Sequence, residues 1–130
     1  MNILTLAQTN KTPEVLFDPA QNYFLIKGRS IPENSTEFYH PVMEWLDKFA
    51  ASEVEAPVTV EVKLEYFNTS SSKCLVDIFR KLEKMHLKGQ PVAVNWYYDE
   101  QDEDMKEAGE DFMGIMKLPI MMIVHDPEED

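Results

Sequence analysis

The apolar residues of this chain change their spacing within one continuous stretch, and that change restricts the folds available to it. Between Val58 and Tyr66 they occupy every second position, which predicts a strand with one buried face. From Leu75 to Met85 they recur at helical spacing, which predicts a helix packed by one face on a sheet. A strand that leads directly into such a helix is typical of α/β folds with a mostly parallel sheet.

Further strands and helices are predicted on both sides of this unit, which itself spans Pro57 to Phe67 and Ser70 to Leu87. Before it we expect an edge strand at Ile3 to Ala7 and a hairpin of Glu14 to Phe17 with Tyr23 to Lys27. A loop at Gly28 to Asn34 and a helix at Tyr39 to Ala51 should follow. The first helix is placed no earlier than Tyr39 because Pro41 is tolerated only in a first turn. After it we expect a strand, a helix and a strand, at Val92 to Tyr97, Asp99 to Met116, and Pro119 to Val124. The last helix is expected to pack through Met105, Ala108, Phe112, Met113 and Met116.

The order of these elements predicts the architecture. Three strands are followed by alternating helices and strands, and the connections are long enough for parallel neighbours. We therefore expect one α/β domain over residues 1–130, with a mostly parallel mixed sheet, an N-terminal β-hairpin and three helices. Polar residues alternate with the valines after Val58, which favours a two-layer domain whose sheet has one open face.

Five consecutive hydroxyl or amide residues, Asn68 to Ser72, occupy the junction between this strand and its helix. Asn, Ser and Thr are preferred N-cap residues, so the run could serve only to start the helix. One cap leaves several hydroxyls unused, however, and a helix N-terminus favours an anion through its unpaired N–H groups and its dipole. The alternative is a reversible phosphorylation site at the start of the helix.

Charge and cysteine content exclude several classes of protein. The chain has 24 acidic and 12 basic residues and a net charge of −12, whereas a nucleic acid or an anionic membrane requires a basic patch. No apolar run reaches the roughly 18 residues of a membrane span, and the N-terminus lacks a signal peptide, which predicts a cytoplasmic protein. Cys74 is the single cysteine, so no internal disulfide is expected; it is either a reactive thiol in the first helical turn or a small packing residue.

An acidic run with aromatic neighbours follows the strand that ends near Tyr97. Asp99 to Asp104 could hold a divalent cation, but the run lacks the central glycine of an EF-hand loop. Carboxylates at a helix start also complement its dipole without a metal, so we favour a partner-facing acidic surface. Alternation along the strand places Trp96 in the core and leaves Tyr97 and Tyr98 as candidate contacts, at the sheet edge expected to hold the hydroxyl run.

Motifs of known enzyme classes are absent from the sequence. His40, His86 and His125 are isolated, and neither a G-x-S-x-G elbow nor a phosphate-binding loop occurs. No nucleophile, base and oxyanion donor can be named together, so an enzyme is the least favoured class. We expect no catalytic residue, no cofactor and no bound metal.

Five runs of sequence, spread over most of the chain, occur in the order found in one known family. They are Thr12-Pro13-Glu14-Val15, Ile31-Pro32-Glu33-Asn34-Ser35, Leu64-Glu65-Tyr66-Phe67-Asn68-Thr69-Ser70-Ser71-Ser72-Lys73, Asn95-Trp96-Tyr97-Tyr98-Asp99-Glu100 and Glu107-Ala108-Gly109-Glu110-Asp111-Phe112. Together they resemble the SiaC-type bacterial regulatory phosphoproteins, which are similar to anti-sigma-factor antagonists of the STAS type. The resemblance implies that residues 1–130 form a single SiaC-like regulatory domain with a STAS-like fold.

The resemblance also implies a partner-switching cycle. The acceptor in the family is a threonine in the N-T-S-S run, which corresponds to Thr69 here. A histidine-kinase-like serine/threonine kinase adds the phosphate and a PP2C-type phosphatase removes it. The unmodified form binds its target, which in the best-known branch is a diguanylate cyclase of cyclic-di-GMP and biofilm signalling. The expected flanking or partner-binding residues are Asn68, Ser70, Ser71, Ser72, Lys73, Tyr97 and Tyr98, with Lys73 screening the phosphate.

The alternative function belongs to a different class. A chain with a net charge of −12 could be an acidic adaptor or mimic that occupies the basic site of another protein, with no phosphorylation involved. Binding of that kind would depend strongly on salt concentration and would not respond to phosphate at Thr69.

Overall fold

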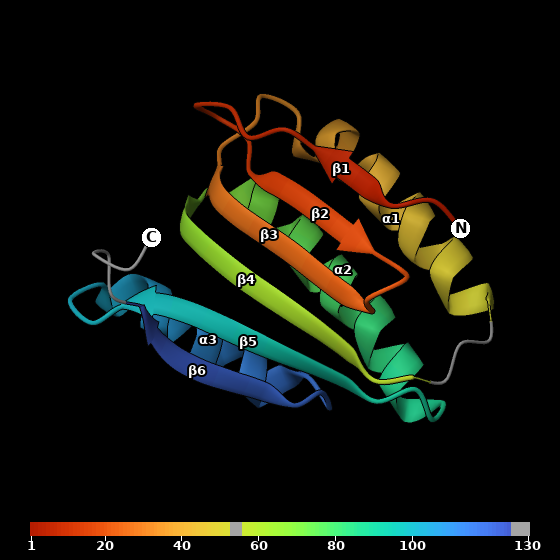
Figure 1. The fold of residues 1–130 in the computed structure, drawn as a ribbon. Helices are drawn as coiled ribbons and strands as arrows, with labels where there is room; N and C mark the ends of the chain where they lie inside the picture. Colours follow the sequence, from red (N-terminus) through yellow and green to blue (C-terminus); the bar gives the residue numbers. More distant parts are fainter. Residues whose placement is uncertain (53–55, 126–130) are drawn as a thin grey trace.

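Six strands form one sheet in which the spatial order is the order along the chain, as the computed structural model shows for residues 1–52 and 56–125 (Figure 1). The strands are β1 (Leu4–Leu6), β2 (Glu14–Asp18), β3 (Tyr23–Ser30), β4 (Val58–Phe67), β5 (Val92–Asp99) and β6 (Ile120–His125). β1, β2 and β3 pair antiparallel, whereas β3, β4, β5 and β6 pair parallel. The predicted mixed, mostly parallel sheet with an N-terminal hairpin is confirmed.

The three helices cover one face of this sheet and leave the other face open (Figure 1). They are α1 (Ser35–Ala51), α2 (Thr69–Leu87) and α3 (Glu103–Ile115). Each helix follows one parallel strand and precedes the next, and right-handed crossovers along a sheet in simple sequential order place all of them on the same side. The predicted two-layer α/β domain is confirmed. Within the described part of the chain no helix is both long and apolar enough to span a membrane.

The core lies between the sheet and the helices. Val58, Val60 and Val62 of β4 point into it, as their alternation predicts, and each is about 1% exposed. Trp96 of β5 is fully buried, and its Nε1 donates a hydrogen bond of 3.0 Å to the carbonyl oxygen of Met105 in α3. The expectation that Trp96 belongs to the core is confirmed.

β3 continues beyond the residue at which a loop was expected to begin. Gly28 has a φ of +118°, a conformation that glycine adopts without strain, and the register with β4 shifts between Gly28 and Arg29. The strand therefore extends to Ser30, and the prediction of a loop from Gly28 is wrong for these three residues because a bulged ladder accommodates the unusual backbone.

The same bulge changes the direction of the last side chains of β4. Glu65 has no β3 partner in the register and is an extra residue in its strand. Tyr66, which the alternation predicts to be buried, is instead 53% exposed. Phe67 packs on the core in its place, edge-on to Trp96 with the ring centroids 6.1 Å apart.

α1 begins at Ser35, earlier than the predicted Tyr39. Asn34 is the N-cap, and its side-chain oxygen accepts a hydrogen bond of 3.0 Å from the backbone N–H of Glu37. Pro41 lies inside the helix, but on its exposed side, where water can serve the carbonyl that loses its helical donor. The prediction was wrong because it treated the proline as a limit on the first turn.

α3 also differs from its predicted boundaries and inner face. It begins at Glu103, because residues 99–102 form a turn in which the backbone N–H of Asp102 donates to the carbonyl of Asp99. Met113 was expected on the inner face but is 45% exposed. Gly109 is buried instead, and the missing side chain lets the helix approach β5 and β6 closely.

Candidate functional site

The hydroxyl run lies at the edge where the parallel strands end, and it starts α2. Asn68 is the N-cap: its side-chain oxygen accepts a hydrogen bond of 2.9 Å from the backbone N–H of Ser71. Its own backbone N–H donates to the carbonyl of Ser30 at the end of β3, 3.0 Å away. One residue of the run therefore supplies the cap, as the simplest interpretation requires, and Thr69 is the first residue of the helix.

A chain of hydroxyl groups connects this helix start to α1 and β3. Ser71 Oγ lies 2.7 Å from Ser30 Oγ, which in turn lies 2.6 Å from the phenol oxygen of Tyr39. Ser35 Oγ lies 2.7 Å from Ser70 Oγ and 3.3 Å from Ser71 Oγ. We call these five residues the hydroxyl chain; it joins the N-termini of α1 and α2.

The direction of most of these hydrogen bonds follows from the single proton that each hydroxyl carries. Ser70 donates to the Asn68 side-chain oxygen at 3.1 Å, so the bond between Ser35 and Ser70 takes its proton from Ser35. Ser71 donates to the backbone carbonyl of Ser30 at 3.0 Å, and Ser30 Oγ therefore donates to Ser71. Tyr39 must then donate to Ser30 Oγ. Burial raises the pKa of Tyr39 to about 12, so the phenol keeps this proton at neutral pH.

Exposure separates the members of the hydroxyl run. Ser71 is fully buried and Ser72 is half-buried, whereas Thr69, Ser70 and Lys73 are exposed. Within residues 1–52 and 56–125, no hydrogen bond engages the Thr69 hydroxyl. Thr69 therefore combines an exposed, unengaged hydroxyl with the first position of a helix, one turn before the lysine.

Cys74 lies on the inner side of α2 and is 9% exposed. Burial raises the pKa of its thiol, and the carboxylate of Asp77 raises it further. A raised pKa disfavours the thiolate, which is the reactive form. Of the two interpretations left open by the sequence, the structure supports the packing residue.

Tyr97 and Tyr98 both lie at the carboxyl edge of the sheet but belong to different surroundings. Tyr97 is half-buried on the open face, with the Lys63 ammonium 4.8 Å from the centre of its ring. Partial burial raises the pKa of Tyr97, and a hydrogen bond to Glu61 and its charge act in the same direction. Tyr98 is half-buried against the edge of the core.

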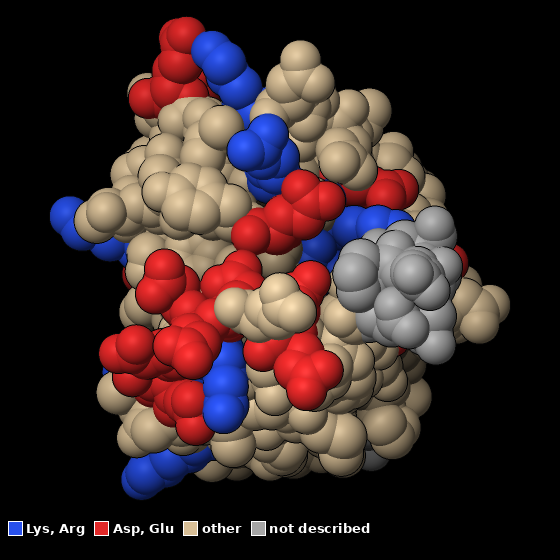
Figure 2. Space-filling model, turned by 90° about the vertical axis from the view of Figure 1, so that its left-hand side faces the viewer, with Lys and Arg blue, Asp and Glu red and all other residues tan. Residues whose placement is uncertain are grey.

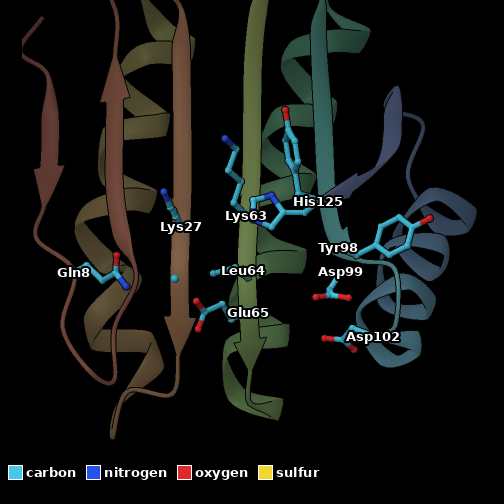
Figure 3. A pocket seen from close by; sticks show the side chains of 11 residues that line it. Gln8, Lys27, Lys63, Leu64, Glu65, Tyr98, Asp99, Asp102 and His125 are labelled. Atoms are coloured by element: carbon cyan, nitrogen blue, oxygen red, sulfur yellow. The ribbon is translucent and has the colours of Figure 1, made fainter. Parts of the chain in front are cut away.

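A pocket of about 470 Å³ opens beside these tyrosines on the open face of the sheet. Lys27 and Lys63 project from neighbouring strands on one side of it, and Glu65, Asp99 and Asp102 lie nearer the strand ends (Figure 3). The pocket is therefore lined by groups of both charges.

Carboxylates gather at the carboxyl edge of the sheet where α3 begins. In Figure 2, which views this edge, they fill much of the lower half, whereas the upper part, where α1 and α2 begin, shows fewer charged side chains, and these are of both signs. Asp102 is the N-cap of α3 and accepts a hydrogen bond of 3.0 Å from the Met105 backbone N–H. Among the residues that the structure describes, no three His, Cys, Asp or Glu side chains are arranged to hold a metal ion.

The supporting half of this site was not predicted from the sequence. Ser30, Ser35 and Tyr39 are buried polar residues from β3 and α1, and no pattern in the sequence assigns them to the hydroxyl run. Ser35 lies in one of the five runs that carry the family resemblance, which was the available signal.

Comparison with known proteins gives one consistent result. The model of the SiaC family of regulatory phosphoproteins matches residues 6–125. The uncharacterized protein PA14_02130 of Pseudomonas aeruginosa (strain UCBPP-PA14) is 34% identical over 126 residues, which cover 97% of this chain and 99% of that protein.

Solved structures of SiaC from Pseudomonas aeruginosa share the fold. The apo form has a TM-score of 0.87 and 32% identity over 95% of this chain and 99% of that chain. SiaC in complex with the diguanylate cyclase SiaD, of which it is the activator, has a TM-score of 0.88 and 33% identity over 94% of this chain and 99% of that chain. The chain belongs to the SiaC family of regulatory phosphoproteins.

Proposed function

We propose that this chain is a non-enzymatic partner-switching regulator whose switch is reversible phosphorylation of Thr69. The observation that carries the proposal is the position of Thr69: its hydroxyl is exposed, free of hydrogen bonds to the described residues, and at the first position of α2. The proposed donor of the phosphate is a histidine-kinase-like serine/threonine kinase, and the proposed remover is a PP2C-type phosphatase.

The proposed target of the unmodified form is a diguanylate cyclase. Support comes from the relative in Pseudomonas aeruginosa, which is the activator of such a cyclase and has the same fold at 33% identity. The proposed contact surface is the carboxyl edge of the sheet, where Thr69, Ser70, Lys73 and the two tyrosines at 97 and 98 are accessible. Ser71 is fully buried, so its expected part at this surface is limited to supporting the cap.

The physical effect of the phosphate differs between the fold and the interface. A phosphate at Thr69 lies at the positive end of the α2 dipole, which stabilises it by about 0.3–1 kcal/mol, with Lys73 one turn away. An interface that covers the same residue must remove water from a group of charge about −1.5 to −2, which costs several kcal/mol unless new partners are supplied. Each 1.4 kcal/mol lowers affinity about tenfold, so the modification can release a partner without unfolding the domain.

The test is phosphate mapping on the chain purified from its native host, with and without the phosphatase, by intact-mass and fragment-ion spectrometry. We expect one phosphate on Thr69 in the absence of the phosphatase, and little phosphate on Thr69→Ala. Undiminished label on Thr69→Ala would assign the acceptor to a neighbouring serine and refute the proposal.

A second candidate, an acidic adaptor, is favoured by the carboxylates gathered around the start of α3 (Figure 2). It predicts target binding that weakens steeply between low and high salt and is unchanged in Thr69→Glu. The switch proposal predicts the opposite response to that substitution.

A further inference from the structure

We infer that Ser35, which lies on α1, determines which hydroxyl of the run is phosphorylated. The inference rests on the proposed switch at Thr69 and adds a positioning residue outside the hydroxyl run. In this account Ser35 holds Ser70 in a hydrogen-bonded state and thereby leaves Thr69 as the reactive group.

Burial alone does not select the acceptor. It removes Ser71, which is fully buried, but Thr69 and Ser70 are adjacent and both are exposed. A serine is also the less hindered nucleophile, because it lacks the methyl group of threonine. The preference for Thr69 therefore needs another cause.

Hydrogen bonding supplies that cause. Ser70 Oγ donates its proton to the Asn68 side-chain oxygen at 3.1 Å and accepts a proton from Ser35 Oγ at 2.7 Å. Ser35 is only 4% exposed, so water does not readily compete for its hydrogen bond to Ser70. The Thr69 hydroxyl has no such partners among the described residues.

Phosphoryl transfer requires a hydroxyl that can give up its hydrogen bonds to other residues of the domain. A bond forms between the acceptor oxygen and the γ-phosphorus of a nucleoside triphosphate held by the kinase, and the bond from that phosphorus to the bridging oxygen breaks. The nucleoside diphosphate leaves, and the hydroxyl proton passes to a base of the kinase. Ser70 must first give up one donated and one accepted hydrogen bond, which corresponds to a disadvantage on the order of tenfold.

The rest of the hydroxyl chain makes this arrangement rigid. Ser35 occupies the first position of α1, and Tyr39 lies one turn later and is held through Ser30 to Ser71. The start of α1 is thereby fixed to the start of α2 at two points, so Ser35 and Ser70 stay in register.

The experiment compares site occupancy in wild type, Ser35→Ala and Ser35→Cys, each phosphorylated in its native host without the phosphatase. Cysteine keeps the size of the buried side chain but is a weak donor, so it reports on the hydrogen bond if alanine impairs folding. We expect the ratio of phosphate on Ser70 to phosphate on Thr69 to rise roughly threefold or more in both variants, because each removes the bond from Ser35 and leaves the bond to Asn68. Thr36→Ala, at the exposed neighbouring residue of α1, is the matched control and should keep the wild-type ratio.

A double variant gives an independent measure. Thr69→Ala should carry little phosphate, all of it on Ser70, whereas Thr69→Ala combined with Ser35→Ala should carry several times more phosphate on Ser70. An unchanged ratio in both Ser35 variants, with Thr69 still modified in wild type, would overturn the inference and leave the proposed switch intact. Label that spreads to Ser71 and Ser72 would indicate local unfolding and would also overturn it. A wild-type chain without phosphate on Thr69 would refute the switch and this inference together.

Discussion

Replacing Gly109 by alanine should destabilise the domain even though alanine is the better helix former. A Cβ at this position would lie 2.5 Å from Cδ1 of Trp96 and 2.7 Å from the sulfur of Met122. The sulfur belongs to a flexible side chain and can move. Trp96 cannot easily do so, because it is fully buried, donates from Nε1 to Met105, and packs against Phe112 with ring centroids 5.4 Å apart.

The magnitude follows from two opposing effects. Forcing an extra methyl group into a packed core costs typically about 1–3 kcal/mol. Replacing glycine inside a helix returns up to about 1 kcal/mol through helix propensity. Because the indole is fixed, the steric cost should lie at the high end, and the net loss in the free energy of unfolding should be about 2 kcal/mol. For a domain of 130 residues this corresponds to a fall in melting temperature of roughly 7 °C.

Gly114 provides the matched control on the same helix. A Cβ there would meet nothing within 4 Å, so Gly114→Ala should raise stability by up to about 1 kcal/mol, less near the helix end. The assay is urea unfolding followed by tryptophan fluorescence and circular dichroism, with the melting temperature as a second measure. A Gly109→Ala variant as stable as Gly114→Ala would refute the argument, since it would mean that β5 and α3 separate at no cost.

Three further outcomes can be measured on the same protein. Thr69→Glu should keep its free energy of unfolding within about 1 kcal/mol of wild type. Its affinity for the target, measured by titration calorimetry, should fall at least roughly tenfold. A large loss of stability would instead make Thr69 a structural cap. Tyr39→Phe removes the donor to Ser30 and should lower the free energy of unfolding by about 1–2 kcal/mol in urea titrations, and no change would show that the hydroxyl chain adds no net stability. The backbone N–H of Lys117, and to a lesser extent Arg80, lower the pKa of Glu83, so the charged carboxylate stabilises the fold above its ordinary pKa of 4.5. This stabilisation is lost as the pH falls through the lowered pKa. The melting temperature of Glu83→Gln should therefore lie below that of wild type at pH 7 and converge with it in acid, and equal melting temperatures at pH 7 would contradict the argument.

The fold was largely predictable because its main signals are local. The alternating valines of β4 and the helical spacing in α2 each depend on residues within one element, and both predictions were confirmed. Two of the errors occurred where a distant residue decides the outcome. Tyr66 follows the alternation in the sequence, but its direction is set by a bulge whose cause lies in the pairing of Gly28 with another strand. Gly109 breaks the apolar pattern of α3, and the reason for a glycine there is its close contact with Trp96, which the sequence does not show.

The candidate site was predictable in part for the same reason. The hydroxyl run from Asn68 to Ser72 is continuous in sequence, so the start of a helix and a surplus of hydroxyls could be identified there. Its supports, Ser30 and Ser35, stand 41 and 35 residues before their partners Ser71 and Ser70. No local period connects such residues, so local patterns did not distinguish Ser70 from Thr69, and only the family resemblance pointed to Thr69.

The distribution of charge at the carboxyl edge explains how one phosphate could change what this surface binds. The part where α1 and α2 begin has fewer charged side chains, of both signs, and it borders the carboxylates around the start of α3 (Figure 2). A phosphate at Thr69 would add about −1.5 to −2 charges to this part, so the acidic area would extend further across the edge. The helix dipole and Lys73 compensate part of that charge within the domain, but a partner fitted to the unmodified surface has no such compensation. A switch at this position therefore acts on the interface and leaves the fold nearly unaffected, which is the behaviour that the Thr69→Glu comparison of stability and affinity measures.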